Sequence, residues 1–329
     1  MVRFGLVGTN WITERFIEAA KEVESFSLTA VYSRTENRAK EFAEKVGAPL
    51  TFTNLEAMAS SGEIDAVYIA SPNSFHAQQA ITFMNHGIHV LCEKPAASNT
   101  SEVKSMIEAA KRNGVVFMEA LKTTLLPNFR VIQENLYKIG KVRRYVASYC
   151  QYSSRYDAYK EGTILNAFNP SFSNGSLMDI GIYGVYPLVV LFGRPKQIKA
   201  NGFVLESGVD GQGSLIVDYG DKEAIVTHSK VSNSYIPSEI QGEEGSIVID
   251  HIHTPQQVVV HYRDGRVEDL TQPQKVQSMY YEAAEFISLI ENKQLESNVN
   301  SHDHSLAVAE ILEEARRQIG LIYPADTFS

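Results

Sequence analysis

The stretch "CEKPAA" (92–97) places a glutamate, a lysine and a proline directly after an apolar run. Proline restricts the residue before it to extended conformations, so Lys94 has a defined direction. Further along, "GSLMDIGIYGV" carries Asp179 and Tyr183 four residues apart, on one face of a predicted helix. A tyrosine can exchange a proton with a hydroxyl group when a nearby cation lowers its pKa from about 10 toward neutrality. Lys94 and Tyr183 are therefore candidate catalytic residues for chemistry at an alcohol or carbonyl carbon, with Asp179 on the same helix face as Tyr183. The alternative is that Tyr183 is a core residue of an apolar helix.

The first part of the chain alternates strands with amphipathic helices, and this order predicts a parallel sheet covered on both faces. Ligands of such sheets bind beyond the carboxyl ends of the strands. Glu93 and Lys94 follow one predicted strand, so we expect them at the ligand edge, together with Gly8, Ser33 and Ser71. The predicted strands are 2–7, 27–32, 64–70, 88–91 and 115–119.

The segment "GLVGTNWIT" (5–13) follows a strand and opens a helix, which is the context of a dinucleotide-binding loop. Of the glycine positions in that motif only Gly8 holds glycine; Asn10 and Thr13 occupy the others. Asparagine tolerates positive φ better than most residues, so we expect the turn to persist. The N–H groups at the helix start would hold a pyrophosphate. The residues predicted to line it are Gly8, Thr9, Asn10, Trp11 and Ile12. A tight turn without a ligand is the alternative.

The end of the second strand bears on the choice of cofactor. An acidic residue there normally binds a free ribose 2′-hydroxyl, whereas "VYSRTENR" offers Ser33 and Arg34, with Arg38 four residues on. Because arginine engages phosphate bidentately, this sequence favours NADP over NAD. In the alternative, Arg34 is a solvated surface charge and Glu36 turns toward the ribose, which would favour NAD.

The second half of the chain has a different pattern. Alternating strands surround a Gly220-Asp221 turn and an Asp264-Gly265 turn, which predicts hairpins in an antiparallel sheet with one covered face. Two helices are predicted at the end of the chain. The change of pattern near Lys122 predicts two domains, 1–121 and 122–329. The fold class is therefore α/β: an N-terminal dinucleotide-binding domain and a C-terminal α+β domain with a large, mostly antiparallel open sheet.

Composition excludes several classes of protein. The 329 residues carry a net charge of −9, which argues against a nucleic-acid backbone as the main partner. Two cysteines give no disulfide framework, which fits a reducing compartment. There is no signal-peptide pattern, and no apolar run approaches the roughly 20 residues of a membrane span. The sequence predicts a cytoplasmic protein without a membrane partner. The histidines, including His251 and His253, form no convincing metal site, so no metal is predicted.

The motifs together resemble the glucose–fructose oxidoreductase / inositol dehydrogenase / MocA family (Gfo/Idh/MocA) over nearly the whole chain. The resemblance rests on "GLVGTNWI", "VYIASPNSFH", "CEKPAA", "FMEA", "GSLMDIGIYGV" and the closing "ESNVNSHDHSLAVAEILEEARRQIGLIYP". Among family branches the chain is most similar to dimeric dihydrodiol dehydrogenases, NADP-dependent xylose dehydrogenases and glucose–fructose oxidoreductase. These carry tyrosine where inositol dehydrogenases carry histidine. The segment "ALKTTLLP" (120–127) departs from these relatives, so we expect Leu121 to Leu126 to form a different pocket wall.

The resemblance implies a Rossmann domain that binds NADP or NAD. It also implies that Lys94 lies beside the nicotinamide, that Tyr183 donates or accepts the proton and that Asp179 binds or orients the substrate. The cofactor-lining residues would include Ser71, Pro72, Asn73, His76, Glu93 and Lys94, although His76 as an ordinary helix-start residue is the alternative. In this family the uncovered face of the C-terminal sheet commonly pairs with a second copy, which implies a homodimer or higher homo-oligomer.

The predicted function is an NADP-preferring oxidoreductase acting on a small-molecule sugar, polyol or diol. Two alternatives stay open. The altered phosphate loop is compatible with a non-catalytic, nucleotide-bound sensor. A redox-assisted glycosidase that holds its cofactor tightly is a chemistry some relatives use. Neither the substrate nor the direction of the reaction follows from the residues.

Overall fold

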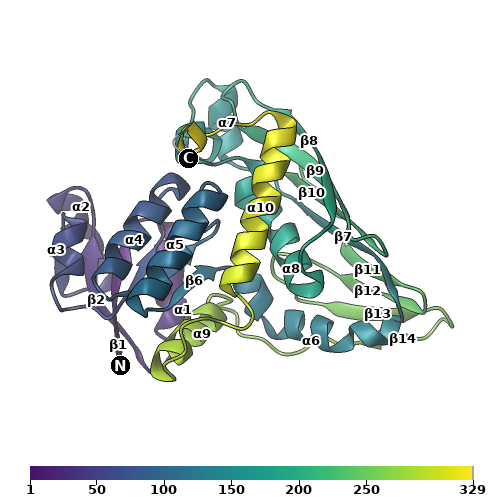
Figure 1. Cartoon of the computed structure of the whole chain (residues 1–329), viewed down its shortest axis with the longest axis horizontal. Coiled ribbons are helices and arrows are strands. Elements are labelled where there is room, and N and C mark those ends of the chain that lie inside the picture. The colour runs from purple at the N-terminus through teal and green to yellow at the C-terminus, as the bar shows by residue number, and fades with distance from the viewer. Residues whose placement is uncertain (328–329) are drawn as a thin grey trace. The chain divides into compact units, whose positions relative to one another are not determined.

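The computed structural model describes residues 1–327, and these form two compact units. The first unit contains Met1–Lys122 and Lys275–Ser305; the second contains Thr123–Gln274 and the residues from Leu306 onward (Figure 1). The change near Lys122 is where the sequence predicted a boundary, but the units are not contiguous as predicted. Residues 275–305 belong to the first unit because helix α9 (Tyr280–Glu291) packs against it, with the ring of Phe286 5.9 Å from that of Phe4.

The first unit is built on a six-stranded parallel sheet in the order β3-β2-β1-β4-β5-β6. The strands agree with the prediction to within a few residues, except that β3, three residues long and partly exposed, was not predicted. This confirms the parallel sheet. The strands are β1 (Val2–Val7), β2 (Phe26–Tyr32), β3 (Leu50–Phe52), β4 (Ala66–Ile69), β5 (His89–Glu93) and β6 (Phe117–Ala120).

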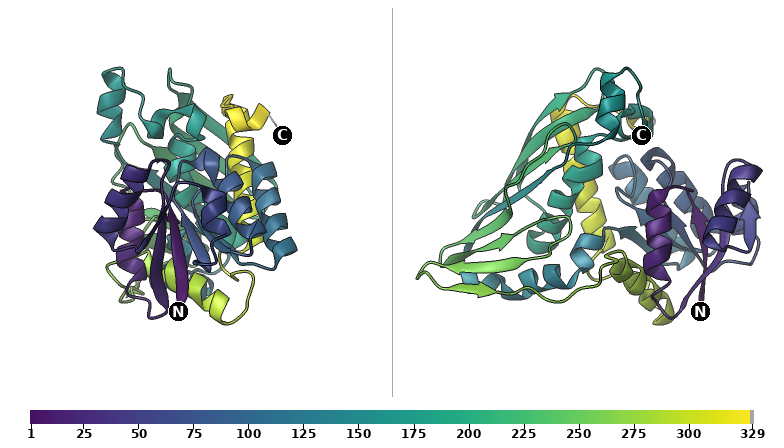
Figure 2. Two further views of the ribbon diagram at one scale, coloured as in Figure 1. Left: turned by 90° about the vertical axis from the view of Figure 1, so that its left-hand side faces the viewer. Right: turned by 180° about the vertical axis from the view of Figure 1, so that it is seen from behind.

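Helices cover both faces of this sheet (Figures 1 and 2). Apolar side chains on their inner faces form the core; for example, Phe16 of α1 stacks on Tyr68 of β4 with ring centroids 3.8 Å apart. Gly47 and Gly114 end α2 and α5 in the left-handed conformation. Besides α9, the helices are α1 (Trp11–Ala20), α2 (Glu36–Val46), α3 (Leu55–Ala59), α4 (His76–Asn85) and α5 (Thr100–Asn113).

The second unit contains an eight-stranded sheet in the order β14-β13-β12-β11-β7-β10-β9-β8. All neighbours are antiparallel except β7 and β10, which run parallel, so the predicted large, mostly antiparallel sheet is confirmed. Both predicted hairpins are present, as β9–β10 and β13–β14. The strands are β7 (Val142–Cys150), β8 (Gln197–Val204), β9 (Asp210–Asp218), β10 (Glu223–Ser229), β11 (Ser238–Gly242), β12 (Gly245–Ile249), β13 (Val258–Tyr262) and β14 (Val267–Asp269).

The helices of the second unit include one that approaches the sheet very closely. A Cβ atom on Gly184 would lie 2.6 Å from Val226 of β10, so glycine permits the contact. On the strands, Phe203 and Ile216 are exposed. The helices are α6 (Pro127–Asn135), α7 (Arg155–Lys160) and α8 (Ile182–Phe192), and α10 (His302–Ile319) runs into this unit from the first.

One apolar segment is longer than the sequence predicted. The run Pro170–Phe192 has the length and composition of a membrane span, but 72% of its most apolar window is buried inside the protein. It includes a π-helical turn, Leu177–Gly181, immediately before α8. The segment is therefore a core element of the second unit, and Pro187 lies inside α8 rather than in the π-helical turn.

Candidate active site

The loop after β1 is fixed by two residues, Gly8 and Asn10. Gly8 has φ +113°, and a Cβ atom there would lie 2.6 Å from the carbonyl oxygen of Ala70, so this position requires glycine. Asn10 has φ −119° and does not use the positive φ that the sequence reasoning allowed for. It is instead the N-cap of α1: its Oδ1 accepts from the N–H groups of Ile12 (3.0 Å) and Thr13 (3.2 Å). Its Nδ2 donates to the Ala70 carbonyl at 2.8 Å.

The predicted ribose-phosphate residues lie at the adjacent strand end. Arg38 of α2 donates to Thr9 of the loop, with Nη2 2.7 Å from the carbonyl oxygen and Nε 3.2 Å from the hydroxyl. Arg34 is exposed and has no hydrogen bond or ion pair to any residue within 1–327. Glu36, the alternative ribose ligand, forms an ion pair with Lys40 at 2.6 Å, and this contact lowers the pKa of its carboxyl group. The available guanidinium here is thus that of Arg34.

His76 connects two loops at the sheet edge. The side chain is 1% exposed. Its Nε2 lies 2.8 Å from the Ser71 carbonyl oxygen and its Nδ1 lies 2.9 Å from the Pro95 carbonyl oxygen. Burial lowers the pKa of His76, so the imidazole is neutral and donates to one carbonyl at a time. His76 therefore tethers the loop after β4 to the turn after β5.

The Glu93-Lys94-Pro95 turn is held by buried partners. Glu93 accepts a 2.6 Å hydrogen bond at Oε1 from the Tyr68 hydroxyl, and its Oε2 accepts from the Lys94 N–H at 3.2 Å. The Lys94–Pro95 peptide bond is cis. The next N–H, that of Ala96, donates to Oε1 of Glu119 at 2.8 Å. These contacts fix the backbone from which Lys94 projects.

Behind this turn lies a group of buried charged residues that the sequence reasoning did not identify as a cluster. Burial raises the pKa of Glu93, raises that of Glu119 to about 7 and raises that of Glu282 well above its ordinary value. Burial also lowers the pKa of Lys122, whose Nζ donates to the Ser278 hydroxyl at 3.0 Å. Glu282 is 1% exposed, and neither of its carboxyl oxygens hydrogen-bonds within the described residues. The feature of the sequence that could have indicated this burial is the position of Glu282 on the apolar face of α9.

In the second unit, Asp179 and Tyr183 lie on consecutive helical segments, Asp179 in the π-helical turn and Tyr183 in the first turn of α8. Asp179 forms an ion pair with Lys230, a buried residue that was not predicted. The Tyr183 ring meets two other rings edge to face: Tyr149 at 5.6 Å and His253 at 6.3 Å between centroids. Tyr149 and His253 stack on each other at 4.2 Å. His253 is a loop residue, and it also borders Tyr183.

A second buried carboxyl group supports the turn that carries Asp179. Asp210, at the start of β9, accepts a 2.7 Å hydrogen bond from the Leu177 N–H. Next to it, His228 Nδ1 lies 2.9 Å from the Ser176 hydroxyl. Burial raises the pKa of Asp210 to about 6 and lowers that of His228 to about 3, so His228 is neutral at physiological pH.

The structure brings the predicted residues together in two groups. Lys94 lies with Glu93 and His76 in the first unit, and Asp179 lies with Tyr183 in the second; the approach of Lys94 to Tyr183 stays a prediction. The expected pocket wall between Leu121 and Leu126 is wrong at its ends, because both leucines are fully buried in the core. Within residues 1–327, no three His, Cys, Asp or Glu side chains are arranged to hold a metal ion.

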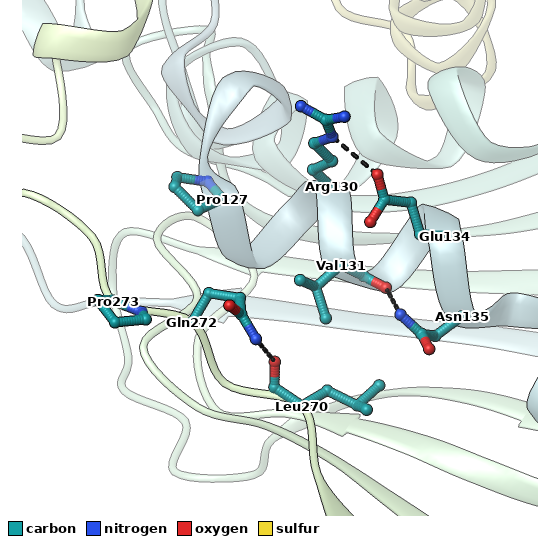
Figure 3. Close-up of a pocket in the computed structure, with 8 residues that line it drawn as sticks. All are labelled: Pro127, Arg130, Val131, Glu134, Asn135, Leu270, Gln272 and Pro273. Atoms are coloured by element: carbon teal, nitrogen blue, oxygen red, sulfur yellow. Dashed lines mark hydrogen bonds and ion pairs between the residues drawn. The ribbon is translucent and has the colours of Figure 1, made fainter.

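A separate pocket of about 540 Å³ lies in the second unit, between α6 and the strand-end segment 270–273. Figure 3 shows that its wall is formed by Arg130, paired with Glu134, on one side and by Leu270 and Gln272 on the other. No residue predicted from the sequence as catalytic or cofactor-binding lines it. Its position therefore adds nothing to the candidate site.

Comparison with protein families gives two matches that follow one another along the chain. Residues 2–121 match the model described as an oxidoreductase family with an NAD-binding Rossmann fold. Residues 134–248 match the model of the GFO/IDH/MocA C-terminal domain. The first match contains Gly8, Arg34 and Lys94, and the second contains Asp179 and Tyr183.

Individual relatives cover the whole chain. The scyllo-inositol 2-dehydrogenase (NADP(+)) IolU of Bacillus subtilis (strain 168) is 60% identical over 326 residues, 99% of each chain. A trans-1,2-dihydrobenzene-1,2-diol dehydrogenase of Danio rerio is 32% identical over 99% of each chain. Among solved structures, the aldose-aldose oxidoreductase of Caulobacter crescentus, complexed with glycerol, superposes with a TM-score of 0.85 at 20% identity, over 96% of this chain and 97% of that chain. That similarity concerns the fold.

Proposed function

The chain belongs to the Gfo/Idh/MocA family of oxidoreductases with an NAD-binding Rossmann fold, and we propose that it is an NADP-dependent dehydrogenase that oxidises a secondary hydroxyl group of a cyclic polyol. The observation that carries the proposal is the 60% identity with an NADP-dependent scyllo-inositol 2-dehydrogenase over 99% of both chains. scyllo-Inositol is therefore the first candidate substrate. The substrate class indicated by the residues alone, a sugar, polyol or diol, is thereby narrowed to an inositol.

The residues at the sheet edge of the first unit fit the cofactor. The Gly8 turn leads into the start of α1, whose positive end would stabilise a pyrophosphate. Ser33 and Arg34 would hold the 2′-phosphate, since the Arg34 guanidinium is exposed and Glu36 is engaged by Lys40. When bound, NADP⁺ supplies the hydride acceptor.

We assign proton transfer and substrate binding to Lys94 of the first unit and to Asp179 and Tyr183 of the second. As the carbinol carbon gives up a hydride and becomes a carbonyl carbon, its hydroxyl group loses a proton, which Tyr183 accepts at Oη. A cation near Tyr183 favours the phenolate form that makes this transfer possible, and we assign that role to Lys94. Asp179 accepts a hydrogen bond from a neighbouring substrate hydroxyl group. Tyr149 and His253 restrain the Tyr183 ring through their edge-to-face contacts.

The test is a turnover assay with purified protein. Formation of NADPH or NADH is followed with scyllo-inositol, myo-inositol, D-glucose, D-xylose and a trans-diol, each with NADP⁺ and with NAD⁺. We expect turnover of an inositol with a clear preference for NADP⁺. Saturable NADPH binding without turnover of any alcohol would contradict the proposal and favour the sensor. Release of nitrophenol from a nitrophenyl glycoside without net cofactor change would favour the glycosidase.

Two variants separate the roles of the residues. Tyr183→Phe is expected to lower kcat about 10²-fold or more with NADPH affinity unchanged, because it removes the proton acceptor and nothing else. Arg34→Ala is expected to weaken NADPH binding about 10-fold or more, with NADH binding nearly unchanged. Arg112→Ala, an exposed arginine on α5, is the matched control. Quenching of Trp11, the single tryptophan, reports binding in each case.

The cytoplasmic location and the homo-oligomer stay predictions. Light scattering on the purified protein tests the second of these. A monomer mass would contradict it without affecting the proposed reaction.

A further inference from the structure

Beneath Asp179 lies a buried lysine to which the proposed reaction gives no role. Lys230 directly follows β10, and its side chain is 4% exposed, against 33% for its ion-pair partner Asp179. Its backbone is held on two sides: its N–H donates to the Gly211 carbonyl at 2.8 Å, and its own carbonyl accepts from the Ser153 N–H at 2.9 Å. A lysine enclosed in this way has few other positions for its ammonium group.

The Lys230 ammonium group borders an aromatic cluster and also interacts electrostatically with the buried carboxyl group of Asp210. It lies over the ring of Phe168, 5.5 Å from the centroid. Phe168 is fully buried and packs against Tyr156 and Tyr159, with centroids 5.6 Å and 5.4 Å away. A ring face attracts a cation, but a buried ammonium group still needs an anion to offset its desolvation. The Asp179 carboxylate supplies it.

Stability alone does not account for such a pair. Replacing a buried ion pair by apolar residues is often neutral or stabilising, so a buried pair is weak evidence of a contribution to folding. This pair, however, has one enclosed member and one half-exposed member, one helical turn before Tyr183. The Asp210 contact to the Leu177 N–H holds the same turn in place. The arrangement therefore fixes one carboxylate beside the proposed proton acceptor.

We propose that Lys230 is a positioning residue that holds the Asp179 carboxylate in the orientation that recognises a substrate hydroxyl group. The inference rests on the proposed function and gives a physical reason for its substrate class: because the pair carries no net charge and its half-exposed member accepts hydrogen bonds, it suits a neutral polyhydroxy compound. An anionic sugar acid or sugar phosphate would place its negative charge against the exposed carboxylate. An interaction with a hydroxyl group that does not react is made equally before and during the reaction, so its loss raises KM more than it lowers kcat.

The experiment compares Lys230→Met and Lys230→Arg with the wild-type protein, using scyllo-inositol and NADP⁺. Lys230→Met should raise KM about 10-fold or more while kcat changes less than about 3-fold. NADPH affinity, measured by Trp11 quenching, should not change. Lys230→Arg should bring KM back to within about 3-fold of the wild-type value, because the cation is restored. If the role of Lys230 were purely structural, Lys230→Met would instead lower the melting temperature and leave KM unchanged.

A double-mutant cycle tests whether Lys230 acts through Asp179. In the Asp179→Asn background, Lys230→Met should leave KM unchanged, since the carboxylate it positions is already gone. The double variant should also melt at a higher temperature than Asp179→Asn alone, in which a buried ammonium group faces a neutral amide. Because the double variant lacks both charges, this comparison remains valid if Lys230→Met alone does not fold.

The outcomes distinguish the inference from the proposed function. A wild-type enzyme that oxidises inositol, with a Lys230→Met variant of unchanged KM, overturns the inference and leaves the function standing. The same holds if the two substitutions raise KM independently in the double variant. A wild-type protein that turns over none of the polyols overturns the proposed function, and the inference with it.

Discussion

Replacing Glu119 by glutamine is expected to stabilise the protein at pH 8 much more than at pH 5. Glu119 is 2% exposed, accepts the Ala96 N–H at 2.8 Å and hydrogen-bonds Ser305. Glutamine has nearly the same shape, and its amide oxygen can accept the same N–H. The substitution therefore removes a titrating group and keeps the packing. The glutamine would still hold the turn after Lys94 in place through the Ala96 N–H.

The magnitude follows from the carboxyl group's pKa. Burial raises the pKa of Glu119 from 4.5 to about 7. Between pH 4.5 and pH 7 the carboxyl group is therefore protonated in the folded protein and ionised in the unfolded chain. The stability that the neutral carboxyl group provides is fully present below pH 4.5 and is lost as the pH rises to about 7. A displacement of about 2.5 pH units corresponds to about 3 kcal/mol at roughly 1.4 kcal/mol per unit. Glutamine avoids this loss.

The assay is urea unfolding of both proteins at pH 5 and pH 8, followed by Trp11 fluorescence, because Trp11 lies in the same unit as Glu119, and by circular dichroism. Coincident transitions justify a two-state treatment. We expect the stability difference between Glu119→Gln and wild type to be about 3 kcal/mol at pH 8 and about 1 kcal/mol at pH 5. Glu108→Gln, at an exposed position of α5, is the matched control. A difference that stays constant between the two pH values would refute the reasoning.

Gly8→Ala should lower the free energy of unfolding by about 2 kcal/mol or more, because its φ of +113° is unfavourable for alanine and the new Cβ atom would meet the Ala70 carbonyl at 2.6 Å. Gly114→Ala, at φ +61° with open space around it, is the control; equal losses in urea unfolding would contradict the steric argument. Glu282→Gln should become more stable relative to wild type as the pH rises above 4.5, since burial raises the pKa of Glu282 well above that value and its ionisation is then a cost of about 1–3 kcal/mol. A Glu282→Gln variant less stable than wild type at pH 8 would show instead that Glu282 is ionised and paired with Lys122.

The local patterns were sufficient for much of the fold. The bounds of strands β1, β2 and β4 were predicted within two residues. A short apolar run that lies between a helix end and a polar turn is typical of a buried strand in a parallel sheet. Gly47 and Gly114 marked helix ends because only glycine adopts the left-handed conformation without strain. Strand β3 was missed because three residues with partial exposure carry almost no periodic signal.

The candidate site was predicted only in part. The candidates that the sequence identified stand at strand ends or share a helix face, where spacing along the chain implies proximity. The N-cap role of Asn10 was not predicted, because its contacts to Ile12 and Ala70 depend on where β4 ends. Lys230 was not found, since nothing near it in the sequence links a lysine after a hairpin strand to an aspartate about fifty residues earlier.

The sequence by itself determined the alternation of elements, the position of the Gly8 turn and the chemistry that Lys94, Asp179 and Tyr183 can perform, because each of these depends on residue type and short-range spacing. Only the tertiary structure decided which of those residues acquire buried partners. Glu282 reaches the first unit through the packing of α9, and Lys230 reaches Asp179 through the pairing of β10 with β7 and β9. The physical reason is that burial and charge pairing are set by residues far apart in the chain, and no local pattern records them.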